Sequence, residues 1–222
     1  MIFPKRVVII CPHPDDETLA MGGSIARMTS TGSKVSILTI SGHLPPLYSE
    51  KEFETTKNEA LNAYEVLNIK DYEFAKLPAT FIHQEPVSKI NKIISDFIKL
   101  RSPEAVFIPF PDRHIDHRTI FDASVVACRP ISASSPSLVL TYETLSETHW
   151  NVPGIEPSFN PNYFIKIEKF IDQKIDALSK YKSQLINNDS RSIEACKALA
   201  RFRGSQNGCK YAEAFQLVRS VN

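Results

Sequence analysis

A histidine and three carboxylates lie within five positions near the N-terminus, in the stretch Pro12-His13-Pro14-Asp15-Asp16-Glu17. Histidine and aspartate are common ligands of divalent metals, and a further carboxylate beside them suits proton transfer. The aspartates could instead cap a following helix, because negative side chains are favoured at a helix N-terminus. That alternative leaves several carboxylates crowded together without a compensating cation. We therefore expect His13 and Asp16 to ligate a metal, with Asp15 facing the bound water.

A second cluster of the same residue types, His114-Ile115-Asp116-His117, lies about a hundred positions later. His117 would complete a set of two histidines and one carboxylate that leaves positions open for water and substrate, and zinc or ferrous iron suits such a set. His114 would remain off the metal as a general acid or as a cation that stabilises an oxyanion. Asp116 could orient an imidazole, most naturally that of His114. The alternative is a solvated polar loop whose turn formers are Pro109, Pro111 and Asp112.

Short apolar, β-branched runs alternate with segments of helical periodicity along the chain. The runs predict strands at Arg6–Cys11, Lys34–Ile40, Tyr72–Leu77, Ala105–Ile108, Leu138–Tyr142 and Tyr163–Ile167. Helices are predicted at 17–30, Glu52–Leu67, Pro86–Leu100, Arg118–Cys128, Lys169–Leu185 and Ser190–Arg203, with a shorter one near Tyr211–Val218. This order predicts one α/β domain over residues 1–222, with a mostly parallel, Rossmann-like sheet and helices on both faces in three layers.

The predicted topology brings the candidate residues to one place, because ligands of a parallel sheet bind beyond the carboxyl ends of its strands. His13 follows the first strand, His43 the second and His114 the fourth. A nucleotide-cofactor domain is a competing interpretation, but no G-x-G-x-x-G follows the first strand. Gly22-Gly23 falls inside a helical pattern instead, and we expect close packing against another element there.

Composition argues against a charged polymer as partner. The net charge of the 222 residues is +1, which gives no bulk attraction to nucleic acid or to an anionic membrane. No apolar run approaches the roughly 20 residues of a membrane span or the roughly 7–15 of a secretory signal. The four cysteines form no CxxC pair and indicate reduced thiols. We therefore expect a cytoplasmic protein that acts on a small molecule, in an oligomeric state that composition does not predict.

The stretch Pro12 to Glu17, Gly22-Gly23 and the later His114-x-Asp116-His117 together resemble the PIG-L/LmbE-like zinc-dependent N-acetyl deacetylases. The resemblance covers most of the chain, and Tyr211 to Phe215 is similar to the C-terminal segment of that family. It implies zinc held by His13, Asp16 and His117, with Asp15 as general base and His114 as the partner acid. One position departs from the family, since Thr56 stands where many members carry a substrate-binding arginine.

The remaining candidates are isolated side chains. His43 could line the pocket or be structural, and Glu143 and Trp150 could contact a sugar or anchor the core. Arg118 could contact substrate or cap its helix. Arg201 and Arg203 could bind a phosphate of a nucleotide-linked sugar or lie solvated at the surface.

These residues lead to one hypothesis, the hydrolysis of an N-acetyl group from an amino sugar that is free, glycosidic or nucleotide-linked. The metal would be Zn²⁺, Fe²⁺ or another divalent ion. The alternatives are a zinc amidase that acts on a sugar-thiol conjugate and an inactive, carbohydrate-binding relative. The presence of all five central residues argues against an inactive site; they are His13, Asp15, Asp16, His114 and His117.

Overall fold

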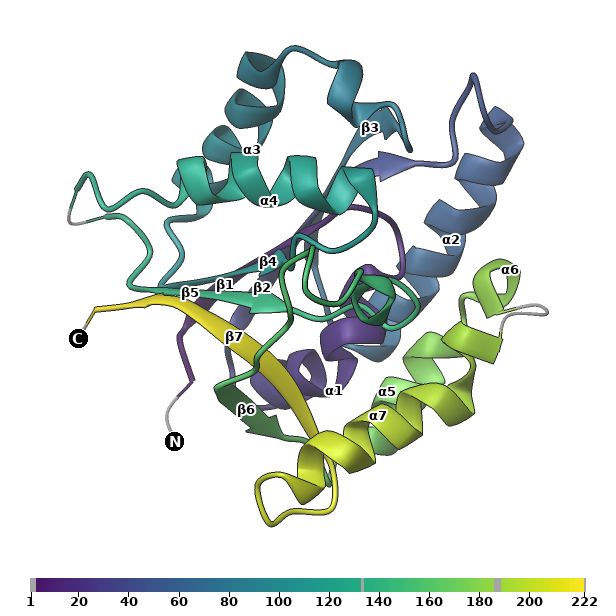
Figure 1. Ribbon diagram of the computed structural model, residues 1–222, viewed down its shortest axis with the longest axis vertical. Helices are drawn as coiled ribbons and strands as arrows, with labels where there is room; N and C mark the ends of the chain where they lie inside the picture. Colours follow the sequence, from purple (N-terminus) through teal and green to yellow (C-terminus); the bar gives the residue numbers. More distant parts are fainter. Residues whose placement is uncertain (1–2, 133, 186–188, 222) are drawn as a thin grey trace.

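The sheet has seven strands in the order β3-β2-β1-β4-β5-β7-β6, in a computed structural model that describes residues 3–132, 134–185 and 189–221 (Figure 1). The strands are β1 (Arg6–Cys11), β2 (Lys34–Gly42), β3 (Asp71–Pro78), β4 (Ala105–Pro109), β5 (Leu138–Tyr142), β6 (Tyr163–Lys166) and β7 (Ala212–Ser220). The first five pair in parallel, whereas β7 is antiparallel to both β5 and β6. The prediction of a mostly parallel sheet is confirmed.

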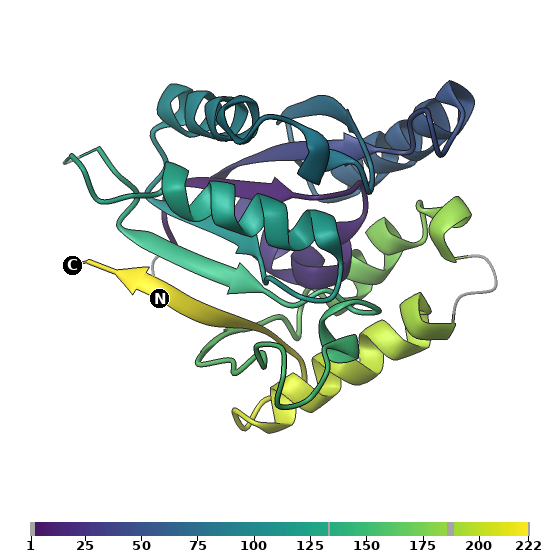
Figure 2. The same cartoon turned by 45° about the horizontal axis from the view of Figure 1, so that its top comes forward.

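Helices cover both faces of this sheet (Figures 1 and 2). They are α1 (Asp16–Ser30), α2 (Glu50–Val66), α3 (Val87–Arg101), α4 (Ile115–Ala127), α5 (Ile171–Leu178), α6 (Lys182–Leu185) and α7 (Ile193–Ser205). Helices α3 and α4 pack on one face, and α1, α2, α5 and α7 pack on the other. The three-layer prediction is therefore confirmed. None of the helices in the described part of the chain is long and apolar enough to cross a membrane.

Strand β1 shows why the sheet is covered on both sides. Val7 and Ile9 belong to the core under α1, α2, α5 and α7, and Val8 and Ile10 belong to the core under α3 and α4. All four side chains are at most 1% exposed. Successive side chains of a strand point to opposite faces, so a continuous apolar run requires cover on both. The run ends at the carboxyl edge of the sheet, in the polar stretch that begins at Pro12.

The predicted helix near Tyr211–Val218 is wrong, because this segment forms strand β7. Its backbone pairs with β5 on one side and β6 on the other. Ala212 and Glu213 are individually better suited to helices than to strands, but pairing on both edges outweighs so weak a preference. The segment therefore completes the sheet from its C-terminal end.

The predicted helix Lys169–Leu185 is divided into α5 and α6 by a turn at residues 179–181. The turn places Tyr181 in the core, where its hydroxyl donates a hydrogen bond to buried Glu17. A buried carboxylate needs such donors, which is a physical reason for the interruption. The other predicted elements are present, with ends within three residues of those expected.

Helix α1 is kinked at Met21, whose φ of −144° and ψ of 24° are not helical. The backbone N–H groups of Gly23 and Ser24 donate instead to the carboxylate of Glu213, at 3.0 and 2.6 Å. Lys174 completes the arrangement, since its Nζ donates to the carbonyl of Leu19 and to Glu213. A buried ion pair from α5 and β7 thus joins the two halves of the helix.

The packing expected at Gly22-Gly23 is confirmed. A Cβ atom on Gly23 would lie 2.7 Å from Cδ1 of Ile167, a distance that side-chain carbons do not tolerate. A Cβ atom on Gly22 would lie 3.2 Å from Cγ of Lys174. The glycines let α1 approach the segment that leads from β6 into α5.

Candidate metal centre and active site

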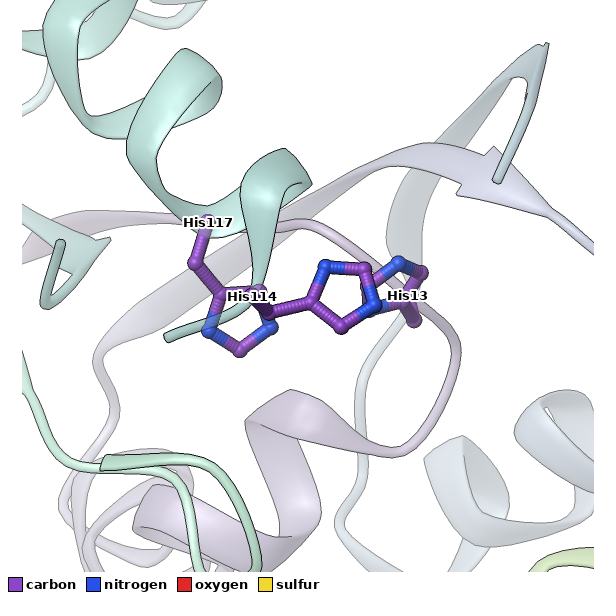
Figure 3. Close-up of side chains that lie close together, drawn as sticks. All are labelled: His13, His114 and His117. Atoms are coloured by element: carbon purple, nitrogen blue, oxygen red, sulfur yellow. The ribbon is translucent and has the colours of Figure 1, made fainter. Parts of the chain in front are cut away.

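The two polar clusters meet at the carboxyl edge of the sheet, where neighbouring strands β1 and β4 lead into α1 and α4. His114 is the N-cap of α4, and His117 lies in its first turn. Figure 3 shows the imidazoles of His13, His114 and His117 gathered in one place. The ring centroid of His13 lies 4.5 Å from that of His114 and 5.5 Å from that of His117. Two segments about a hundred positions apart thus form one cluster.

The residues of this cluster fit a divalent metal. The Oδ2 atom of Asp16 lies 3.4 Å from Nδ1 of His13 and 3.5 Å from Nε2 of His117. Nε2 of His117 is fully buried and has no hydrogen-bond partner among the described residues. A buried imidazole nitrogen without a partner is costly unless it binds something, and a metal is the usual choice. Ligand atoms of His13, His114 and His117 also lie within 4.8 Å of one another, so His114 borders the same space.

Asp112 contacts the ring nitrogen of His117 that points away from Asp16, a role that the sequence alone does not reveal. Its Oδ2 lies 3.0 Å from Nδ1 of His117 and accepts a hydrogen bond from the hydroxyl of Thr148 at 2.9 Å. A carboxylate on the far nitrogen of a ligating histidine sets the tautomer and orients the ring. The sequence offers Asp112 only as a turn former, in the alternative of a solvated polar loop. Its place three positions after the end of β4 and five positions before His117 is the available signal.

Asp116 contacts a different histidine from the one expected. Its Oδ2 lies 3.0 Å from Nε2 of His13 and accepts the N–H of Thr80 at 2.6 Å. Nδ1 of His114 is 4.0 Å from that carboxylate. His114 instead accepts the backbone N–H of Asp116 at 3.2 Å. The geometry therefore favours Asp116 as the group that orients His13 and leaves Nδ1 of His13 for a metal.

Asp15 does not act as a side-chain cap of α1, although it occupies the N-cap position. Its φ of 113° lies in the left-handed region, and its carboxylate is turned toward Arg191 rather than toward the helix. Burial raises the pKa of Asp15 to about 8, with the charge of Asp16 adding to the effect and the Arg191 guanidinium opposing it. A buried carboxylate on a strained backbone, beside residues that could hold a metal, is typical of a catalytic group.

The cluster collects more negative charge than its own cations balance. Burial disfavours charge on His13 and His117, yet neighbouring carboxylates raise the pKa of His13 to about 9 and that of His117 to about 10. Burial and the charges of these two rings lower the pKa of His114 to about 4. Proton-binding sites of this kind also attract metals, which displace the protons.

His43 lines a cleft of about 320 Å³ beside the site, together with residues of α2 and α6. Thr56 belongs to this cleft, but its side chain is buried and its hydroxyl donates to the carbonyl of Phe53. Glu59 joins the two helices, since its carboxylate accepts the N–H and the hydroxyl of Ser183. The cleft is lined by hydroxyl, imidazole, phenol, carboxylate and amide groups; its lining residues are His43, Tyr48, Glu52, Thr55, Thr56, Ser183 and Gln184.

The remaining candidates lie away from the three imidazoles or are already engaged. Arg203 forms a bidentate pair with Glu143, and Arg201 donates to the carbonyl of Lys210. Arg118 donates to the carbonyls of Asp112 and Arg113 and so braces the loop before α4. Trp150 is 59% exposed. These contacts favour structural roles for the arginines over phosphate binding.

The fold and the site together define an α/β protein with a candidate metal centre of histidines and carboxylates at the carboxyl edge of its sheet. A family model described as PIG-L: GlcNAc-PI de-N-acetylase matches residues 8–128, a range that contains both clusters. The chain belongs to this family.

Similar proteins include enzymes of more than one kind. The chain is 26% identical to diacetylchitobiose deacetylase from Thermococcus kodakarensis, over 98% of this chain and 84% of the relative. The solved N,N'-diacetylchitobiose deacetylase from Pyrococcus horikoshii matches 97% of the chain and 84% of its own, with a TM-score of 0.78 and 21% identity. A 4-carboxy-2-hydroxymuconate hydratase from Pseudomonas putida matches 98% of each chain, with a TM-score of 0.79 and 17% identity. The fold alone therefore does not specify a reaction, and the site must do so.

Proposed function

We propose that this protein is a metal-dependent hydrolase that removes the acetyl group from an N-acetylated amino sugar. The observation that carries the proposal is the buried Nε2 of His117, which has no hydrogen-bond partner in the described part of the chain. It faces Asp16, beside the carboxylate of Asp15, whose backbone is strained. Membership of the PIG-L family and the likeness to diacetylchitobiose deacetylases support the same reaction. The substrate is proposed to be free, glycosidic or nucleotide-linked.

His13, Asp16 and His117 would hold the metal, for which zinc and ferrous iron are the leading candidates. When bound, such an ion lowers the pKa of water toward ~7 and polarises a carbonyl group. Asp15 then takes the proton of the attacking water on its carboxylate. Asp112 and Asp116 keep the rings of His117 and His13 in their ligating orientations.

His114 would stabilise the oxyanion that develops on the acetyl carbonyl. Its Nδ1 accepts the backbone N–H of Asp116, so the neutral ring carries its proton on Nε2. The N–H at Nε2 can therefore donate a hydrogen bond to the oxyanion without the ring being a cation. Departure of the amine requires a proton, which Asp15 can return after it has accepted one from water.

The proposal is tested by acetate release from metal-stripped protein that is reloaded with Zn²⁺ or Fe²⁺. The substrates are N-acetylglucosamine, N,N'-diacetylchitobiose, a glycosyl-malate and a UDP-linked N-acetyl sugar. We expect metal-dependent turnover of at least one of them, and turnover lowered to a small residual rate in Asp15→Asn with the metal still bound. The Asp15→Asn result separates chemistry from metal loss, because His13→Ala should instead lower metal content in elemental analysis.

Metal binding without acetate release from any of these sugars would contradict the proposal. Binding of the sugars without turnover would then favour the inactive carbohydrate-binding alternative. Turnover confined to a sugar-thiol conjugate, assayed beside these sugars, would favour the amidase alternative. An Asp15→Asn variant with wild-type kcat would refute the role of the base.

A further inference from the structure

Arg191 reaches the proposed active site from the C-terminal third of the chain. It lies in a short 3-10 helix, Asp189–Arg191, directly before α7. Its Nη1 donates to Oδ2 of Asp15 at 3.2 Å, its Nε to the hydroxyl of Ser146 at 2.8 Å, and its Nη2 to Glu147 at 3.1 Å. The Arg191 side chain is 22% exposed. The planar guanidinium thus uses all three of its nitrogens on two separate segments.

Both segments have unusual backbones at the point of contact. Asp15 has a φ of 113° and Ser146 a φ of 81°, in the left-handed region that residues other than glycine seldom occupy. Such a conformation is costly and persists only where surrounding contacts hold it. Arg191 bonds the side chains of both strained residues. It is therefore placed to hold the β1–α1 turn against the loop after β5.

The hydrogen bond from Arg191 fixes the direction of the Asp15 carboxylate. Arg191 engages Oδ2 of that carboxylate, which leaves Oδ1 to receive a proton. The Asp15 side chain is 3% exposed and makes no cap bond to α1, so helix capping does not fix the direction of its carboxylate. A fork-shaped donor anchored at the same time by Ser146 and Glu147 does fix it.

We propose that Arg191 is a positioning residue for Asp15, and this inference rests on the proposed function of that carboxylate as the base. Arg191 neither gains nor loses a proton in the reaction. Its guanidinium holds one oxygen of Asp15 so that the other stays directed at the attacking water. A misplacement of about 1 Å in a reacting group costs on the order of a hundredfold in rate.

The test compares Arg191→Met and Arg191→Lys with the matched control Arg201→Met, an exposed arginine that donates to one backbone carbonyl. We expect Arg191→Met to lower kcat about 10- to 100-fold, with KM changed less than threefold and metal content unchanged. Arg191→Lys should recover part of the lost kcat, because it restores a cation beside Asp15. Arg201→Met should match the wild type.

The decisive arm adds Arg191→Met to Asp15→Asn. A positioning role predicts a further loss in residual rate of less than twofold, because the group to be positioned is already gone. A full additional loss, or a raised KM with unchanged kcat, would overturn the proposal and make Arg191 a substrate-binding residue. If the wild type releases no acetate, the proposed deacetylase function is refuted, independently of the contact between Arg191 and Asp15. In that case the same double-mutant cycle is read in chemical denaturation, where additive effects of the two changes would overturn the positioning contact itself.

Discussion

The buried pair of Lys174 and Glu213 should be the most sensitive ion pair of this molecule. Both side chains are 3% exposed, and Glu213 accepts the two N–H groups freed by the kink in α1 as well as the ammonium of Lys174. Removal of one partner from such a pair leaves the other charge buried and costs about 3–5 kcal/mol. We therefore expect Glu213→Gln and Lys174→Met each to destabilise the protein by roughly this amount.

The double variant measures the coupling free energy between the two side chains. Lys174→Met together with Glu213→Gln leaves no uncompensated charge, so its cost should fall short of the sum of the single changes by about 2 kcal/mol or more. The assay is urea denaturation, in which the midpoint and slope give the free energy of unfolding. For a chain of this size, each single change should lower the Tm by roughly 6–20 °C.

Lys180 and Asp176 form the matched control, since they are an exposed pair on the same part of the chain. Breaking that pair should cost about 0–1 kcal/mol. Additive effects of Lys174→Met and Glu213→Gln within about 0.5 kcal/mol would refute the reasoning. The two residues would then stabilise α1 independently, and not as an ion pair that connects its two halves.

Three further predictions concern the site and the thiols. Asp112→Ala should weaken metal binding about 10- to 100-fold, measured by competition with a chromophoric chelator, because the ring of His117 loses its orienting carboxylate. Zinc at a hundred times its Kd should raise the free energy of unfolding by about 2.7 kcal/mol in the wild type and by much less in His117→Ala. In an alkylation time course at pH 8 read by peptide mass spectrometry, Cys209 should react first, since the other three thiols are buried and burial raises the pKa of Cys128 to about 12.

Each of these has an outcome that contradicts it. Unchanged metal affinity in Asp112→Ala would mean that the protein backbone alone orients His117. Equal stabilisation by zinc of the wild type and His117→Ala would place the binding site elsewhere. Early alkylation of Cys11, which is completely buried at the end of β1, would show that the β1–α1 turn opens readily.

Most of the sheet and half of the site could be predicted from the sequence because local patterns determine them. The continuous apolar run of β1 and the facing apolar positions of α3 are periodic signals, and the two polar clusters directly follow strands. The topology rule for parallel sheets then brings the clusters together without further information. These inferences required no knowledge of distant contacts.

The features that the sequence did not predict depend on contacts between distant segments. β7 was mistaken for a helix because its partners, β5 and β6, lie more than forty positions away in the sequence. Asp112 and Arg191 have no local pattern that separates them from a turn former and a surface arginine. Their roles arise from contacts with His117 and Asp15 that exist only in the folded chain. Likewise, the turn at Tyr181 follows from a buried Glu17 in a different helix.

The contact between Glu213 and the kink in α1 also affects the order in which the chain folds during synthesis. Gly23 and the carboxylate of Glu213 that accepts its N–H are 190 positions apart, so the helix that carries Asp16 cannot make this contact before residue 213 has left the ribosome. Contacts of such long sequence separation form late and leave earlier segments exposed in the meantime. We expect nascent chains that end before β7 to display an unfinished α1 and a weak metal site. Pairing of β7 would then complete both helix α1 and the candidate metal site that it carries.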